Sequence, residues 1–321
     1  MIIHYRIVSL PLLSLALRSP LHGALAMAFL LFSTFVCALR WHLLTSALGM
    51  RLKWSHTLGL TFVGNFFNTV MPGSIGGDLV KAASLATFKK GTGQVPIGLF
   101  SIVLDRLVGF CTMLLLTTMA EYAWPRPVPL PKELGNALVW ISWAEAAGLV
   151  SLLFFFTLSS VALRVERGMK HYQNLPGMIV VKSLLEYRKK GWVVFRAFVL
   201  SFVSLVATLW LYQIQGEWIG MSVRFADYAR TVPLGLVASS VPLLPGGIGV
   251  GQLAFFKLFA LLKNGSAQDA ATLCTVIQAY TIVFNCFGGL AYFFLPTQRA
   301  AVHPNRRSSS RPLPDLVEIP T

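Results

Sequence analysis

Long apolar segments recur along the sequence and constrain its fold more than any other feature. Five stretches are mostly apolar over about 20 residues or more, the length that a helix needs to cross a bilayer. They cover residues 21–39, 96–122, 136–163, 192–215 and 270–295. Only 12% of the 321 residues are charged, about half of the roughly 25% found in soluble domains. The sequence therefore predicts an all-α polytopic membrane protein with about five full spans.

Basic residues gather between these segments, and their distribution predicts the topology. Loops rich in Lys and Arg face the cytoplasm. Residues 40–53, 89–90 and 164–191 and the tail beyond 299 have this character, so we expect a cytoplasmic C-terminus and place Arg40 in a cytoplasmic loop. Residues 1–20 contain an apolar run too short to span comfortably, which predicts an interfacial segment. The basic, proline-containing tail, residues 296–321, is expected to be disordered, leaving 21–295 as the transmembrane domain.

Two related motifs interrupt the apolar pattern, one in each half of the chain. Met71-Pro-Gly-Ser-Ile-Gly76 is echoed by Leu244-Pro-Gly-Gly-Ile-Gly249. The loop charges place both ends of the first broken segment, near 55–90, on the cytoplasmic side and both ends of the second, 231–263, on the outer side. We therefore expect two broken, re-entrant helical hairpins that form an inverted repeat, although two short crossings would also fit the first segment. Such paired breaks point to a transporter's binding site.

The break in the first hairpin needs polar partners. Backbone groups within a membrane must be satisfied internally, so a break at Pro72 and Gly73 has to be buried in protein or face a wet cavity. Asn65 and Asn68 lie on the same helix face as Pro72. Their amides can bond the carbonyl groups that the break releases, or a bound head group. We favour the structural role for Asn65 and leave both roles open for Asn68.

The residues after this break form a candidate anion site. Gly76 and Gly77 begin a half-helix whose free N–H groups and positive dipole end suit a phosphate group. Asp78 is either the N-cap of that helix or a site residue. Lys81 lies on the same face as Asp78, so it can pair with Asp78, hold an anionic head group, or extend toward the membrane surface.

The second hairpin offers a similar but less polar set. Pro245 breaks the segment, and Gly246, Gly247 and Gly249 are expected to open a second half-helix that mirrors the first. Gln252 is the side chain there that can donate to or accept from a ligand. Glycines alone are also consistent with close helix packing, so the specificity of this prediction comes from the pairing of the two hairpins.

Charged residues also occur within the predicted spans. Asp105 and Arg106 lie about ten residues into the span that starts near Pro96, where charges normally face a bundle interior or a cavity. Adjacent helix positions do not face each other, so we expect different partners for the two, with Asp78 and Lys81 as candidates. An interfacial position is the alternative. Glu145 is a further acid in an apolar span, suited to proton transfer or to simple pairing.

Several function classes find no support in the sequence. The four cysteines and six histidines are scattered without metal-ligand spacing, and soluble-enzyme motifs are absent. We therefore expect no cofactor, no metal and no soluble type of catalysis. The net charge of +15 is explained by cytoplasmic loops, and basic residues are not interleaved with aromatic ones as on nucleic-acid-binding surfaces. We expect no nucleic-acid partner.

These motifs together resemble the lysylphosphatidylglycerol synthase transmembrane-region family, also called flippase-like domain proteins, over roughly residues 21–295. The resemblance is carried by Arg40-Trp41 and the apolar stretch that follows it, Asn68, Pro72–Asp78, Lys81, Asp105-Arg106 and the motif at 244–249. It implies a bacterial inner-membrane protein that moves membrane lipids or lipid-linked intermediates between leaflets. It also implies membrane lipids as ligands, with a second copy or lipid-synthesis enzymes as possible partners.

The sequence departs from the family pattern at several positions. The family usually has Arg at the position of Lys81, a Glu-Arg pair at 105–106 and often Glu at the position of Gln252; the missing acid argues against proton coupling through the second hairpin. An N-terminal span common in the family is not found, so we expect an internal start or a shortened segment. No aminoacyl-transferring domain follows, so lysyl transfer is not expected.

The leading hypothesis is a lipid translocase. The alternatives are a membrane enzyme that uses Asp78 or Asp105 on a lipid head group, and a non-transporting partner of a lipid-synthesis complex.

Overall fold

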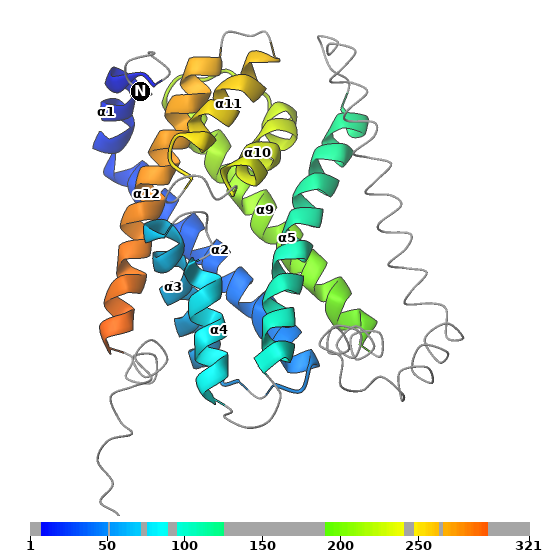
Figure 1. Cartoon of the computed structure of the whole chain (residues 1–321). Coiled ribbons are helices and arrows are strands. Elements are labelled where there is room, and N and C mark those ends of the chain that lie inside the picture. Colours follow the sequence, from blue (N-terminus) through cyan, green and yellow to red (C-terminus); the bar gives the residue numbers. More distant parts are fainter. Residues whose placement is uncertain are drawn as a thin grey trace, which may run out of the picture.

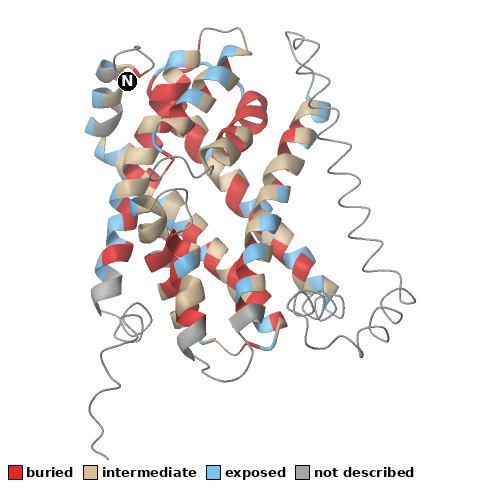
Figure 2. Cartoon of the chain, viewed as in Figure 1, coloured by how far each residue is buried: buried red, intermediate tan, exposed pale blue. Residues whose placement is uncertain are grey.

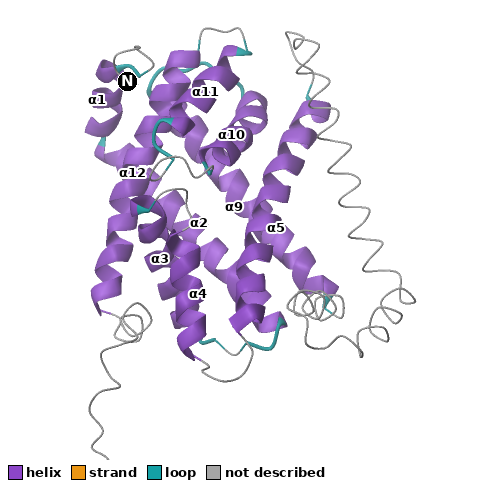
Figure 3. Cartoon of the chain, in the orientation of Figure 1, coloured by secondary structure: helices purple, strands orange, loops and turns teal. Residues whose placement is uncertain are grey.

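A computed structural model describes residues 8–50, 52–71, 76–88, 95–124, 190–240, 247–262 and 266–294. Every regular element in these ranges is a helix, and they contain no strand (Figure 3). The helices are α1 (Leu10–Arg18), α2 (Pro20–Ala47), α3 (Trp54–Val70), α4 (Gly76–Phe88), α5 (Val95–Ala123), α9 (Gly191–Trp218), α10 (Phe225–Ser239), α11 (Val250–Ala260) and α12 (Ala267–Phe294). The predicted all-helical class is confirmed. The span expected at 136–163, with Glu145, and the tail 296–321 lie outside the described residues.

Four of the described helices are long and apolar enough to cross a membrane: α2, α5, α9 and α12. In the most apolar stretches of α2, α5 and α9, only 22% to 33% of the residues are buried, and exposed and intermediate positions recur along these helices (Figure 2). Large apolar side chains account for much of this exposed surface, among them Phe35, Val103 and Phe195. An apolar belt of this extent suits contact with lipid rather than water. The chain is a multi-pass membrane protein.

The shorter helices form two pairs at opposite ends of the bundle. Helices α3 and α4 pack against each other, as do α10 and α11. The first pair occupies the lower half of the view in Figure 1 and the second pair the upper half. The segments that join the members of each pair, 72–75 and 241–246, lie outside the described residues, and with them the predicted breaks at Pro72, Gly73, Pro245 and Gly246.

Glycines let the helices within each pair approach at backbone distance. A Cβ atom at Gly77 of α4 would lie 2.8 Å from Asn68 Nδ2 of α3 and would also overlap the carbonyl oxygen of Gly64. In the second pair, a Cβ at Gly251 of α11 would lie 2.8 Å from the Oγ of Ser239 of α10. Both pairs therefore depend on small residues at the contact, a feature typical of helix packing in membranes.

Two of the predicted boundaries are wrong, and both errors concern charged residues. Helix α2 continues to Ala47, so Arg40 lies inside a helix rather than in a cytoplasmic loop, because apolar residues resume directly after Arg40-Trp41-His42. Helix α10 begins at Phe225, not near 231, which places Asp227 and Arg230 in a helix instead of in a loop. In each case an ion pair inside the protein accommodates the charge. The bounds of α5, α9 and α12 agree with the prediction to within a few residues.

Candidate functional site

A buried ion pair joins three helices in the lower half of the bundle. Arg40 of α2 donates from Nε to Asp105 Oδ1 of α5 at 2.7 Å and from Nη2 to Asp105 Oδ2 at 3.0 Å. Its Nη1 donates to Ser201 Oγ of α9 at 2.5 Å. Arg40 and Asp105 are both buried, and buried charges persist in such surroundings only when they are paired and hydrogen-bonded. This triad fixes α2, α5 and α9 relative to one another.

A second ion pair, beside the first, is more open. Arg106 donates from Nε to Asp78 Oδ2 at 3.0 Å and from Nη2 to Asp78 Oδ1 at 3.2 Å, so it links α5 to the first turn of α4. The Arg106 and Asp78 side chains are 37% and 28% exposed. As predicted, Asp105 and Arg106 have different partners. The open pair is the better candidate for exchange with a ligand, because water and anions can reach it.

Lys81 supplies a third cation. Its Nζ lies over the ring of Trp41, 4.4 Å from the ring centroid, within the range of a cation–π interaction. It lies close enough to both Asp105 and Asp78 for electrostatic interaction, yet among the described residues no carboxylate is within ion-pair distance of it. Trp41, which is fully buried, thus holds a lysine beside two ion pairs.

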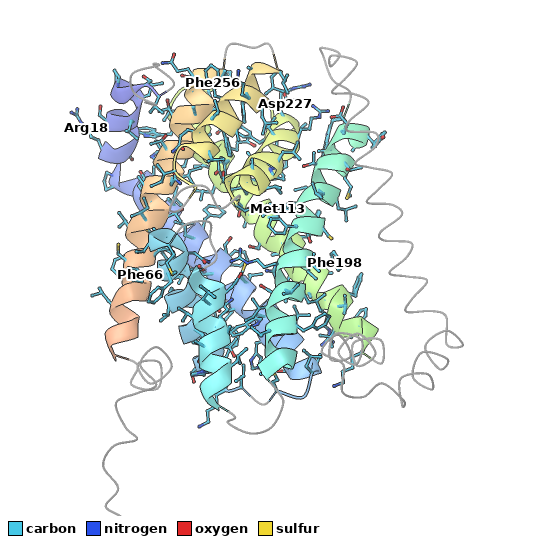
Figure 4. The ribbon with its side chains drawn as sticks, in the orientation of Figure 1. Arg18, Phe66, Met113, Phe198, Asp227 and Phe256 are labelled. Atoms are coloured by element: carbon cyan, nitrogen blue, oxygen red, sulfur yellow. The ribbon has the colours of Figure 1, made fainter. Side chains whose placement is uncertain are left out.

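A cavity of about 230 Å³ opens beside these charges. Its charged end is formed by Arg40, Asp105 and Arg106, and its remaining wall is a mixture of hydroxyl and apolar side chains from α2, α5, α9 and α10. One of the apolar lining residues, Met113, lies near mid-height of the bundle in Figure 4. The cavity therefore reaches from the charged cluster into the centre of the protein.

A second cavity, of about 360 Å³, continues the first. Both are lined by Cys37, Ser204, Thr208 and Leu236. The second extends to Ser239 at the end of α10 and to Gln278 and Thr281 of α12. The two neighbouring cavities, called the hollow below, extend between Arg106 of α5, which binds Asp78 of α4, and Ser239 of α10. Like most ligand-binding pockets, this hollow is concave and mostly apolar, with a few polar groups in its wall.

The predicted residues of the second hairpin satisfy one another. Gly247 and Gly249 adopt positive φ angles of 70° and 91°, which glycine accepts readily. Gln252 Oε1 accepts from the Gly249 N–H at 2.6 Å, and its Nε2 donates to Gln278 Oε1 at 2.6 Å. Gln252 thereby connects the start of α11 to the cavity wall, and its hydrogen bonds are made within the protein.

The asparagines of the first hairpin also have structural partners. Asn68 Oδ1 accepts from the Gly77 N–H at 2.7 Å across the break, and Asn65 Nδ2 donates to Thr34 Oγ1 of α2 at 3.3 Å. Helix α4 begins at Gly76, as predicted, but Asp78 is its third residue. The N-cap interpretation of Asp78 is therefore wrong, and its carboxylate binds Arg106 instead.

Sequence reasoning missed two parts of this arrangement. Arg40 and its hydroxyl partner Ser201 were not among the candidates, although a charge followed by a further apolar stretch was a usable signal for Arg40. A second charged cluster lies in the upper half of the bundle, where Figure 4 shows Asp227. There Arg230, with 1% of its side chain exposed, donates to Asp227 Oδ1 at 2.7 Å and lies 3.4 Å from Glu121 Oε2 of α5. It also donates to the carbonyl oxygen of Trp124.

The fold and this site define a class: a helical membrane protein with two short helix pairs at opposite ends and a charged, hollow interior. The model of the family described as lysylphosphatidylglycerol synthase TM region matches residues 8–289. The chain belongs to that family, which gives it a role connected with membrane lipids. The comparisons with curated proteins and with solved structures gave no match.

Proposed function

We propose that this protein is a lipid translocase that passes an anionic or lipid-linked head group between leaflets through the hollow in the bundle. The observation that carries the proposal is that Arg106, whose ion pair with Asp78 is partly open, lines the charged end of the hollow, and that the hollow extends to Ser239 of α10. A head group needs polar partners inside the membrane, while its acyl chains remain in lipid. The hollow supplies such partners on several helices.

The route through the site follows from competition for Arg106. An anionic head group that enters the cavity displaces the Asp78 carboxylate, because both bind the same guanidinium fork. Asp78 must take Arg106 back before the head group can leave. Asp78 thus keeps the Arg106 guanidinium ion-paired whenever no head group is bound, and the pair forms again after each head group has left.

The vesicle test uses Asp78→Asn. Neutral asparagine cannot compete with a phosphate for Arg106, so we expect head-group release to slow and leaflet exchange of a fluorescent anionic lipid to fall about tenfold or more, the size of one charge-assisted hydrogen bond. The measurement is the rate of lipid exchange in reconstituted vesicles that carry the wild type or the variant. Asp269→Asn, in the first turn of α12, is the matched control.

The outcome separates the proposal from its alternatives. Lack of protein-dependent exchange for every anionic lipid tried would refute the translocase. A covalently changed lipid in the same vesicles would favour a membrane enzyme. Equal exchange by wild type and Asp78→Asn would remove this ion pair from the mechanism.

Re-entrant hairpins that enter from opposite faces are part of the same proposal, and labelling can test them. Lys53 precedes α3, Ser222 precedes α10 and Ala260 ends α11; all three are exposed. In a background without the native cysteines, we expect Ser222→Cys and Ala260→Cys to react with an impermeant thiol reagent from one face, and Lys53→Cys from the other. Labelling of the α10 and α11 positions from different faces would show that this pair crosses the membrane.

A further inference from the structure

The two cavities of the hollow meet at four residues that line both of them: Cys37, Ser204, Thr208 and Leu236. Three of these carry a thiol or a hydroxyl group and come from α2 and α9. They are connected to one another, since the Ser204 hydroxyl lies 3.8 Å from Cys37 Sγ and the Ser204 carbonyl oxygen accepts from Thr208 Oγ1 at 2.9 Å. The fourth, Leu236, is apolar and comes from α10. The junction therefore has a polar side on α2 and α9 and an apolar side on the second short helix pair.

Leu236 lies on the less enclosed part of α10. Residues 226–233 of this helix are all buried, whereas residues 236–240 are all partly exposed. Arg230 fastens the buried part to α5 through an ion pair. Pro233 lies within the helix, and it has no N–H group to donate to the preceding turn, which weakens the helix just before Leu236. The Leu236 side chain can therefore change its position while the start of α10 stays fixed.

An apolar side chain at this junction is a barrier to polar groups. Narrow apolar constrictions lose their water, and for this reason they stop charged groups. The first cavity has Arg40, Asp105 and Arg106 in its wall, whereas none of the described residues that line the second cavity is charged. Leu236 thus lies where a charged cavity meets an uncharged one.

Resting on the proposed function, we propose that Leu236 is the gate between the two cavities. In its observed position it separates the first cavity, which water reaches at the partly exposed Arg106, from the second. A head group passes when the Leu236 side chain moves aside, and it then meets the hydroxyl groups of Ser204 and Thr208. Leu236 controls this passage and does not itself bind the head group.

Native cysteines can report on the gate. Cys37 lines the junction, whereas Cys274 lines the second cavity and not the first. Cys111 and Cys286 are exposed and are replaced by alanine, and one of the two reporters is kept at a time. The probe is sulfonatoethyl methanethiosulfonate, a small anionic thiol reagent that does not cross membranes. It is added to sealed vesicles that contain the full chain, at the face from which Lys53→Cys reacts, and the rate of labelling is measured by mass spectrometry.

The expected result is that Cys37 reacts readily and Cys274 slowly while Leu236 is in place. Leu236→Ala should accelerate the labelling of Cys274 roughly 10- to 100-fold, the factor equivalent to burying one leucine side chain. Leu236→Asn, which is similar in size but polar, should also accelerate it, because the junction then stays wet. This second variant serves as the test if Leu236→Ala does not fold. Leu234→Ala is the matched control without effect, since Leu234 is a partly exposed leucine of the same helix that lines neither cavity.

Three results would overturn the gate. Lack of labelling of Cys37 would show that water does not reach the junction from this face. Equal rates for Cys37 and Cys274 with Leu236 in place would show that no barrier separates the cavities. An unchanged rate for Cys274 in both Leu236 variants would place the barrier elsewhere.

The labelling assay is independent of leaflet exchange, so the gate and the translocase can fail separately. Accelerated labelling of Cys274 in the Leu236 variants, without lipid exchange by any form of the protein, would refute the translocase and leave the gate standing. Lipid exchange together with unchanged labelling would refute the gate and leave the translocase standing.

Discussion

Asp105→Asn is expected to destabilise the protein by about 3–5 kcal/mol, because it leaves the Arg40 guanidinium buried without a counter-charge. Two charge-assisted hydrogen bonds join these side chains, and Ser201 is the only other hydrogen-bond partner of Arg40 within the described residues. The loss should appear as a lower midpoint of thermal unfolding, measured in detergent as the fraction of protein that keeps its native elution volume.

The double variant Arg40→Met with Asp105→Leu provides the decisive comparison. The double variant has no Arg40 charge left buried without a counter-charge, so it should be more stable than Asp105→Asn. Glu217→Gln is a control, since Glu217 is exposed and, within the described ranges, its carboxylate accepts a hydrogen bond from Gln213 alone; it should change stability by less than about 0.5 kcal/mol. A double variant that is less stable than Asp105→Asn would show that the pair contributes more than charge balance.

Gly77→Ala is expected to destabilise the α3–α4 pair by about 3 kcal/mol, the upper end of the usual cost of overpacking. The added methyl group would overlap the Gly64 carbonyl oxygen and lie 2.8 Å from Asn68 Nδ2. Backbone atoms cannot rotate away, so the helices must separate, and the hydrogen bond from the Gly77 N–H to Asn68 would be strained. The same thermal assay measures the effect.

Gly23→Ala is the matched control for this prediction. A Cβ at Gly23 of α2 would lie 3.6 Å from the ring of Tyr280, an ordinary contact. Alanine is a better helix former than glycine by about 1 kcal/mol, so this variant should be neutral or more stable. Equal unfolding midpoints for the two variants would contradict the close-packing interpretation of Gly77.

Local patterns in the sequence were sufficient for most of the helices and for part of the site. The length and polarity of α5, α9 and α12 define those spans, and the glycines at 76–77 mark where α4 begins. The cluster around Asp78, Lys81, Asp105 and Arg106 follows from charges in apolar surroundings. These are short-range signals, which a single sequence retains.

The remaining parts depend on contacts between distant residues. Arg40 looks like the end of a span until Asp105, 65 residues away, and Ser201, 161 residues away, are known to meet it. Asp227 and Arg230 likewise look like loop residues until Glu121 is brought beside them. The position of a buried charge can be predicted only together with its partner, and tertiary packing determines which residue that partner is. The lack of N-capping by Asp78 has the same origin, because Arg106 determines where its carboxylate points.

Helix α5 carries the ion pairs that hold both short helix pairs. Arg106 binds Asp78 of α4, and Glu121, about 22 Å farther along the helix at 1.5 Å per residue, faces Arg230 of α10. Neither helix pair can shift against α5 without separating one of these contacts. The two are unequal, since the lower contact is partly open to water whereas Arg230 is almost fully enclosed. Helix α5 is therefore joined to the two helix pairs by one partly open and one enclosed ion pair. We expect the open one, between Arg106 and Asp78 of α4, to separate first.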